Sequence, residues 1–457
     1  DFYFNYGFTW SEATTSNISF RILSKGNMFD PSGPSGFIVQ NDKTNIFSII
    51  SILNSCPFLY LVSLSLGLAA EGRKHYTTGT INKTPFPELN ESQSEQLASL
   101  AKRGWSLKRN LDTVNETSHA FILPPSLRNR FGDYNPVSIE KELDQIQNEI
   151  DDIAFDLYGF TQEDRIAATE EYENNINTTN DDDEDSQINA TDNETLLSWA
   201  VGVVFGRFDV KLATGEKELP KEPDPFDPLP EYSPGMLQVD GEASGDQNDI
   251  LVDDPMHPND LTNLVQKVLD TVNVNIPTDI RQWITTKFFD FHLKMYSKSR
   301  RKAPIYWPLS SPNGLYRIWV YYPRMTDQTL YGAVNQYLDP KIKYVQQELN
   351  QLQNKSTNRT SSEEIQLEKQ SNLEQDLISF REKLLEKAQT YKPHHDDGVE
   401  VTASPLANFF KHKSWNKALK TTWTKLDKGD YDWSYTAMDN WPERVREKCK
   451  KDNTRCI

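Results

Sequence analysis

Basic side chains followed by aromatic ones form the clearest functional signal in this sequence of 457 residues. They lie in the stretch SKSRRKAPIYWPLSSPNGLYRIWVYY, at 297–322. Cations can neutralise phosphates and bind nucleic acid by releasing counterions, whatever the base sequence. A solvated surface is the ordinary alternative for the cations within this stretch and just before it, which are Lys294, Lys298, Arg300, Arg301 and Lys302.

Aromatic residues and two isolated cations offer further contacts. Tyr306 and Trp307 could stack on bases, or they could pack the core of a sheet. Arg21 and Lys25, on and just after an expected strand, could contact base edges or phosphates. We predict these four residues and the five cations above as DNA contacts, with core packing as the alternative for the two rings.

Catalytic motifs of the common kinds are absent from the sequence. It contains no glycine-rich dinucleotide loop, Walker loop, nucleophile elbow or HExxH motif. The stretch PHHDDG at 393–398 could hold a metal ion, but adjacent residues of an extended chain point to opposite sides, which favours a loop. We therefore predict no catalytic, cofactor-binding or metal-binding residue in this chain.

The formal net charge of −18 comes from one region of the chain. Residues 170–260 hold 24 Asp and Glu against 4 Lys and Arg, so this region carries −20 and the rest of the chain +2. Its most polar part is expected to be a disordered, solvated insert. A docking tail and a DNA mimic are the alternatives.

Strands are expected around both groups of candidate contacts. Alternating apolar residues in 15–29 predict a half-buried strand that carries Arg21, and 37–40 predicts a second strand. The aromatic runs APIYWPL and LYRIWVYYP are separated by SSPNG. That turn signal is strong because Asn-Gly readily adopts positive φ, so the two runs predict a β-hairpin.

Helices are expected over much of the remaining chain. The apolar stretch 46–70 is interrupted by Asn54, Ser55 and Pro57, which favours two buried helical pieces over a membrane span. Apolar residues spaced by 4, 3, 4, 3 and 4 over 138–158 predict a helix that packs on another helix. Further helices are expected at 92–116, at 259–296 and, as an antiparallel helical hairpin, at 329–390.

Composition and patterning together predict a multi-domain α+β protein. Its segments are a target-recognition-like segment (1–90), a helical spacer with coiled-coil-like helices (91–169), a disordered acidic linker (170–195), a Pro- and acid-rich extended segment (196–258), a helical domain with a small aromatic β-hairpin (259–400) and a small basic, Trp-rich C-terminal region (401–457).

Several sequence blocks, in consistent order from about residue 4 to residue 447, resemble one protein family. They include RGWSLKRNLDTVNETSHAFILP, LLSWAVGVVFGRFDVKLATGEKELPKEPDPFDPLPEYSPGML, DILVDDPMHPNDL and LDKGDYDWSYTAMDNWPERV, besides the stretches around Arg21 and at 297–322. They look like the C-terminal half of large adenine-specific DNA methyltransferases. These are the PglX-type enzymes of BREX phage-defence systems and the related type IIG restriction-modification methylases.

The resemblance implies a catalytic half that this chain does not show. Such enzymes place an S-adenosylmethionine-binding, Rossmann-like domain first, and then a region that reads duplex DNA while the target adenine is flipped out. Their methyl-transfer motif is Asn or Asp, two prolines and an aromatic residue. The nearest tripeptide here is NPV at 135–137, and the chain starts at Asp1, so we expect the N-terminal catalytic domain to be missing.

The resemblance therefore implies the DNA-recognition and structural region of an enzyme that methylates the exocyclic amine of adenine. Expected partners are double-stranded DNA and the missing methyltransferase domain, in the cytoplasm of a prokaryote. S-adenosylmethionine would serve the full-length enzyme and would not bind this chain alone. The main alternative is a non-catalytic scaffold that docks other subunits of a defence complex through the helical hairpin and the acidic insert.

Overall fold

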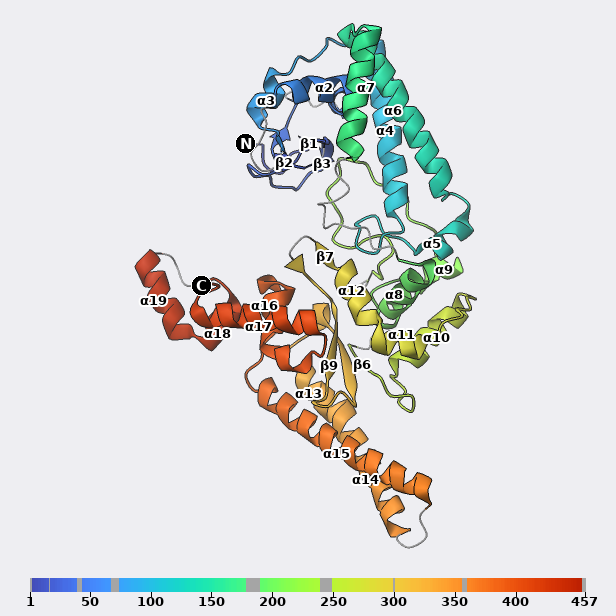
Figure 1. Cartoon of the computed structure of the whole chain (residues 1–457), viewed down its shortest axis with the longest axis vertical. Coiled ribbons are helices and arrows are strands. Elements are labelled where there is room, and N and C mark those ends of the chain that lie inside the picture. Colours follow the sequence, from blue (N-terminus) through green and yellow to red (C-terminus); the bar gives the residue numbers. More distant parts are fainter. Residues whose placement is uncertain are drawn as a thin grey trace. The chain divides into compact units, whose positions relative to one another are not determined.

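The computed structural model describes residues 2–15, 17–38, 43–66, 74–177, 190–238, 249–298, 301–355 and 360–453. The chain forms two compact units, each of mixed helix and strand (Figure 1). Unit 1 comprises Asp1–Gln187 and Lys211–Met236, and unit 2 comprises Ile188–Val210 and Leu237–Ile457. The predicted multi-domain α+β class is confirmed, and both units are discontinuous in sequence.

Unit 1 is built on a small antiparallel sheet in the order β3-β1-β4. Its strands are β1 (Gly7–Thr9), β3 (Arg21–Leu23) and β4 (Ser35–Gly36), beside a second pair formed by β2 (Ala13–Thr14) and β5 (Lys74–His75). The strand predicted for 15–29 is therefore much shorter, and the one predicted for 37–40 falls after β4, partly outside the described residues.

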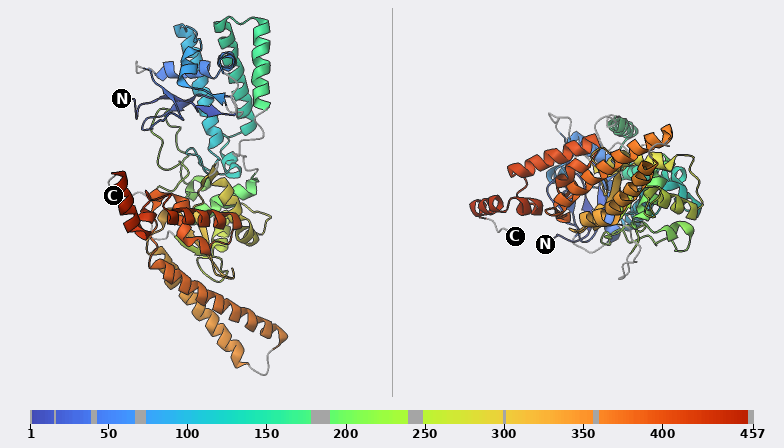
Figure 2. Two further views of the ribbon diagram at one scale, coloured as in Figure 1. Left: turned by 60° about the vertical axis from the view of Figure 1, so that its left-hand side comes forward. Right: turned by 90° about the horizontal axis from the view of Figure 1, so that it is seen from below.

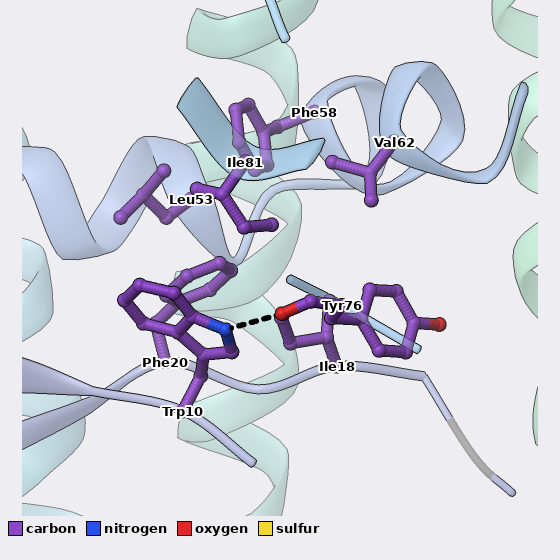
Figure 3. Close-up of a cluster of buried hydrophobic side chains, with 8 residues drawn as sticks. All are labelled: Trp10, Ile18, Phe20, Leu53, Phe58, Val62, Tyr76 and Ile81. Carbon is purple, nitrogen blue, oxygen red and sulfur yellow. Dashed lines mark hydrogen bonds between the residues drawn. The ribbon is translucent and has the colours of Figure 1, made fainter. Parts of the chain in front are cut away.

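Aromatic and aliphatic side chains close the core under this sheet (Figure 3). The Trp10 indole N–H donates a hydrogen bond of 2.8 Å to the Tyr76 carbonyl, which ties β1 to the end of β5. The cluster consists of Trp10, Ile18, Phe20, Leu53, Phe58, Val62, Tyr76 and Ile81.

The apolar stretch of unit 1 forms two helices, as predicted. These are α1 (Lys43–Leu53) and α2 (Cys56–Leu64), and Pro57 lies in the first turn of α2. Asn54 at the break pairs with the backbone of Phe20: its Nδ2 donates to the Phe20 carbonyl at 2.9 Å, and its Oδ1 accepts from Phe20 N at 2.8 Å. This side chain fixes the residue just before β3 to the end of α1.

Among the described residues, no single helix is long and apolar enough to cross a membrane. The bent pair of α1 and α2 passes the same test only when its two helices are taken together.

Longer helices pack beside α1 and α2. The predicted heptad stripe lies on α6 (Pro136–Tyr158), which contacts α4 (Glu91–Asp112) and α2, so the helix-packing prediction is confirmed. The remaining helices of unit 1 are α3 (Thr78–Lys83), α5 (Pro125–Arg128), α7 (Gln162–Asn177) and α9 (Val210–Thr214).

Unit 2 contains the predicted hairpin, joined by a third strand. β9 (Tyr306–Ser310) pairs antiparallel with β10 (Arg317–Tyr321), and β10 also pairs antiparallel with β6 (Ile250–Val252). The turn contains Gly314 at a φ of +77°, as the Asn-Gly signal predicted. Buried Asp376 fixes this turn by accepting hydrogen bonds from Asn313 N at 2.7 Å and Leu315 N at 3.3 Å.

The extended segment predicted for 196–258 is wrong at both ends. Its first residues belong to α8 (Asp192–Val204), where Leu196, Leu197 and Trp199 are buried, and its last residues include β6. The prediction rested on the prolines in the middle of this segment and not on the apolar residues at its two ends. Residues 178–189 of the predicted acidic linker lie outside the described residues, while α7 and α8 occupy its two ends.

Helices make up the rest of unit 2. The predicted helical hairpin is confirmed by α14 (Asp339–Asn354) and α15 (Ser361–Ala388), which lie side by side and project from the sheet (Figure 2). The other helices are α10 (Leu261–Thr271), α11 (Ile280–Thr286), α12 (Phe288–Met295), α13 (Thr329–Gly332), α16 (Val399–Ala403), α17 (Lys413–Lys428), α18 (Tyr435–Asn440) and α19 (Pro442–Asp452).

A partly buried carboxylate joins two of the helices in unit 1. The Asp151 Oδ1 on α6 accepts a hydrogen bond of 2.7 Å from Cys56 N at the start of α2. Burial raises the pKa of Asp151 to about 6 despite this hydrogen bond. At this position the folded protein therefore favours the neutral acid over the ionised carboxylate.

We expect Asp151→Asn to stabilise unit 1 at pH 8, because Asn keeps the acceptor and removes the partly buried charge. A raised folded-state pKa means that stability is full at low pH and is lost as the pH rises through about 6. Urea unfolding should show a gain of about 1–3 kcal/mol at pH 8 that vanishes near pH 4. An exposed aspartate of the same helix serves as the control: Asp144→Asn should change little, and an equal effect of both variants would contradict this account.

Candidate nucleic-acid interface

Three of the predicted phosphate contacts of unit 2, Lys298, Arg301 and Lys302, lie on a short two-stranded ribbon. β7 (Ser297–Lys298) pairs antiparallel with β8 (Arg301–Lys302), between the end of α12 and the start of β9. Lys298 and Arg301 are exposed and Lys302 is partly exposed, whereas Arg300 lies outside the described residues. We call the paired strands Ser297–Lys298 and Arg301–Lys302 the cationic ribbon.

The ribbon places like charges next to each other. Lys298 and Arg301 are direct cross-strand partners, so their side chains share one face of the ribbon. Like charges in directly opposed positions destabilise a strand pair, and a lone two-stranded ribbon is only marginally stable. This pairing is unfavourable for folding, and an anion placed over it would relieve the repulsion.

His292 of α12 fixes the base of the ribbon. Its Nε2 accepts hydrogen bonds from Ile305 N at 2.9 Å and from Tyr306 N at 3.3 Å. The ring is fully buried, and this burial, together with the nearby Arg207 guanidinium, holds the pKa of His292 well below its usual value. A neutral imidazole is required here because a protonated Nε2 cannot accept a hydrogen bond.

Two further contacts fix the ends of the ribbon, in addition to those of His292. Ala303 N donates to the Tyr296 carbonyl at 2.8 Å, just outside the paired residues of the ribbon. The Arg207 guanidinium packs over the Tyr296 ring, 5.2 Å from its centroid, and donates to its hydroxyl. The chain therefore leaves α12 and enters β9 at one fixed place, and the cations lie on the loop between them.

Lys294 is less available than the ribbon cations. Its Nζ forms an ion pair of 2.7 Å with Asp290 one turn earlier on α12. Asp290 also contacts the His412 Nε2 at 3.2 Å, so the same carboxylate serves two elements. A phosphate would have to compete with Asp290 for Lys294.

The stacking role predicted for Tyr306 and Trp307 is wrong, and the alternative of core packing holds. Both side chains are 0% exposed, so no base can reach either ring. Tyr306 stacks on Phe205 with ring centroids 4.9 Å apart, and Trp307 stacks on Tyr322 at 4.8 Å. Their aromatic surface stabilises the sheet that carries the ribbon.

Arg21 and Lys25 belong to unit 1, apart from the ribbon residues of unit 2. Arg21 is exposed on β3, at the edge of its sheet, and its Nε donates to the Ser19 hydroxyl at 3.3 Å. Lys25 is also exposed, with its Nζ 5.5 Å from the centroid of the Tyr6 ring. Both side chains are exposed to solvent, and they belong to a different unit from the ribbon cations.

The two histidines of PHHDDG bind different partners. The His394 Nε2 contacts Asp439 Oδ2 at 2.8 Å, and the His395 Nε2 contacts the Met325 carbonyl at 3.1 Å. Across the described ranges, no group of three or more His, Cys, Asp or Glu side chains is arranged to hold a metal ion. The segment is part of a loop with a short helical turn at His395–Asp397.

His292 was not among the predicted site residues, although the sequence holds a signal for it. Phe288 and His292 are four residues apart on an apolar helix, so they share its buried face. A histidine on such a face needs a partner for its ring nitrogen. Sequence spacing alone could not show that this partner is the start of the next strand.

Comparison with known proteins places the chain near one class of enzyme. No protein-family model matches it. The adenine-specific methyltransferase BrxX of Escherichia coli O9:H4 (strain HS) is 24% identical over 419 residues, covering 81% of this chain and 33% of BrxX. The chain is distantly related to BREX-type methyltransferases. It spans about a third of the length of this relative.

Replacing His292 tests its role at the ribbon base. We expect His292→Leu to destabilise unit 2 by about 2–4 kcal/mol at pH 7.5, because two buried N–H groups lose their acceptor. For the unaltered chain, a lowered folded-state pKa means that stability is full above pH about 6.5 and falls as the pH decreases below it. Urea unfolding at pH 7.5 and pH 5.5 measures both effects.

The variant should lose the part of this pH dependence that His292 contributes. His119→Gln, at an exposed histidine, is the control and should keep it. An unchanged pH dependence in His292→Leu would show that the neutral imidazole does not hold the ribbon base.

Proposed function

We propose that this chain is the DNA-recognition and structural C-terminal region of a site-specific adenine DNA methyltransferase of a restriction-modification or phage-defence system. The whole enzyme would transfer a methyl group from S-adenosylmethionine to the exocyclic amine of adenine in duplex DNA. The cofactor and the catalytic residues would belong to the N-terminal methyltransferase domain, so this chain alone is expected to be inactive.

Two kinds of evidence support this proposal. The relative at 24% identity is named an adenine-specific methyltransferase, and the similarity extends over 81% of this chain. The sequence contains no Asn-Pro-Pro-aromatic motif, which agrees with a role in binding and not in methyl transfer.

The observation that carries the DNA-binding role is the pairing of Lys298 with Arg301. The two positive charges repel each other in the free protein, and both side chains are exposed and lie outside the core. Phosphates of a duplex would neutralise both cations, and the released counterions would drive binding. Such contacts position the protein without reading the sequence. Arg21 and Lys25 on unit 1 are proposed to contact base edges or phosphates.

The binding role can be tested by removing the ribbon cations. In the triple variant Lys298→Ala, Arg301→Ala, Lys302→Ala, the slope of log K against log salt should become shallower by about 2–3, at about 0.9 per lost phosphate contact. Fluorescence anisotropy with a 30-base-pair duplex over a range of salt concentrations measures this slope.

A matched control removes the same charge from another surface of unit 2. Lys343, Lys369 and Lys383 are exposed on the helical hairpin, and their triple Ala variant should leave the slope unchanged. Absent or salt-insensitive duplex binding by the unaltered chain would contradict the proposal. Methylation of DNA by this chain with added S-adenosylmethionine would refute the claim that it lacks the catalytic part.

A scaffold role remains a second candidate because of the helical hairpin. α14 and α15 project from the sheet and expose Tyr344 and Ile365, which are 44% and 56% accessible. Exposed apolar side chains on a projecting element suit a protein partner. The double variant Tyr344→Ser, Ile365→Ser should abolish co-purification of a defence-complex subunit under this second role, and it should leave duplex binding intact.

A further inference from the structure

α17 presents a basic outer face that the DNA-binding role of the ribbon does not use. The opposite face of this helix is buried through Trp415, Leu419, Thr422 and Leu426, and it packs on α16 and on the helical turn at Ser404–Phe409 (Figure 1). This packing fixes which side of the helix faces outward. The lysines of the helix are Lys413, Lys417, Lys420, Lys425 and Lys428, and all of them are exposed.

The outer face of α17 is electrostatically unfavourable for the helix itself. Lys413, Lys417 and Lys420 follow one another at spacings of 4 and 3, so their charges are neighbours on one stripe. Lys413 also lies in the first turn, where the helix dipole disfavours a cation. In the part of the chain that the structure describes, none of these three side chains has an ion pair or hydrogen bond.

The nearby acidic groups do not neutralise this stripe. Asp427 is the one acidic residue within α17, near its C-terminal end. Glu400 of α16 accepts a hydrogen bond from Thr422 on the buried face, and Asp290 contacts the His412 imidazole before the helix begins. Asp432, after the helix, is paired with Arg444.

Another long helix of the same unit shows a different charge pattern. α15 has seven acidic and four basic residues, and the two signs are interspersed along its length. α17 has five basic residues and one acidic residue. The excess of lysine on α17 is therefore not shared by α15.

The start of α17 is attached to the helix that carries the cationic ribbon. The His412 Nε2 lies 3.2 Å from Asp290 Oδ1 on α12, and the His412 ring packs against Phe289 with centroids 5.5 Å apart. Phe289 also contacts Phe410, with ring centroids 6.4 Å apart. One short helix, α12, thus contacts the start of α17 and leads directly into the ribbon.

We propose that the outer face of α17, through Lys413, Lys417 and Lys420, is a second phosphate-binding surface for duplex DNA. The inference rests on the proposed DNA-binding function and adds a surface to it. From Lys413 to Lys420 the stripe spans about 10 Å of the helix axis, comparable with about three phosphates of one strand at about 3.4 Å of axial rise each. Flexible lysine stems on an exposed face can follow such a backbone.

The test replaces the three lysines with glutamine, which has a similar helix propensity and keeps much of the side-chain length. In the full chain, Lys413→Gln, Lys417→Gln, Lys420→Gln should make the slope of log K against log salt shallower by about 2–3 and weaken duplex binding at least about tenfold at 150 mM salt. The control, Lys343→Gln, Lys369→Gln, Lys383→Gln, should change neither quantity. Circular dichroism should show unchanged helix content in both variants.

The outcomes separate this inference from the proposed function. Duplex binding that depends on the ribbon cations but not on the α17 lysines would overturn the inference alone. An unaltered chain that does not bind the duplex would overturn both. Vesicles containing 30% phosphatidylglycerol serve as the competing polyanion, and lysine-dependent binding to them without duplex binding would also overturn the inference.

Discussion

The buried His292 imidazole is the constraint on which the basic surface of unit 2 depends. Its Nε2 accepts from two successive backbone N–H groups, those of Ile305 and Tyr306, at the start of the central hairpin. The helix that precedes the ribbon and the start of the strand that follows it are thereby held together. The ribbon cations can repel each other without unfolding the ribbon because its base is fixed by neutral, buried contacts.

The stability of the sheet and the proposed binding involve different residues within one sequence stretch. Tyr306 and Trp307 are completely buried and stabilise the sheet, while Lys298 and Arg301 are exposed and add repulsion. The overall charge of −18 conceals this arrangement because residues 170–260 carry −20 of it. Acidic proteins can therefore keep local cationic surfaces, provided that the excess acid lies elsewhere in the chain.

Local patterns predicted the local structure well and the tertiary contacts poorly. The turn signal SSPNG and the apolar spacing of 138–158 specified a hairpin and a packed helix, since both depend on neighbouring residues. β6 was missed because this three-residue strand is stabilised by pairing with β10, more than sixty residues later. The stacking role of the two rings failed for the same reason: their burial depends on Phe205 and Tyr322, distant in the sequence or across the sheet.

The central claim is that the cationic ribbon contacts duplex DNA, and lysine footprinting measures this most directly. Acetylation of the chain with and without a 30-base-pair duplex, followed by mass spectrometry, reports the accessibility of each lysine amine. We predict protection of Lys298 and Lys302 by the duplex, with unchanged labelling of Lys369 and Lys383 on α15. Equal labelling of Lys298 and Lys302 in the free and the DNA-bound chain would contradict the account.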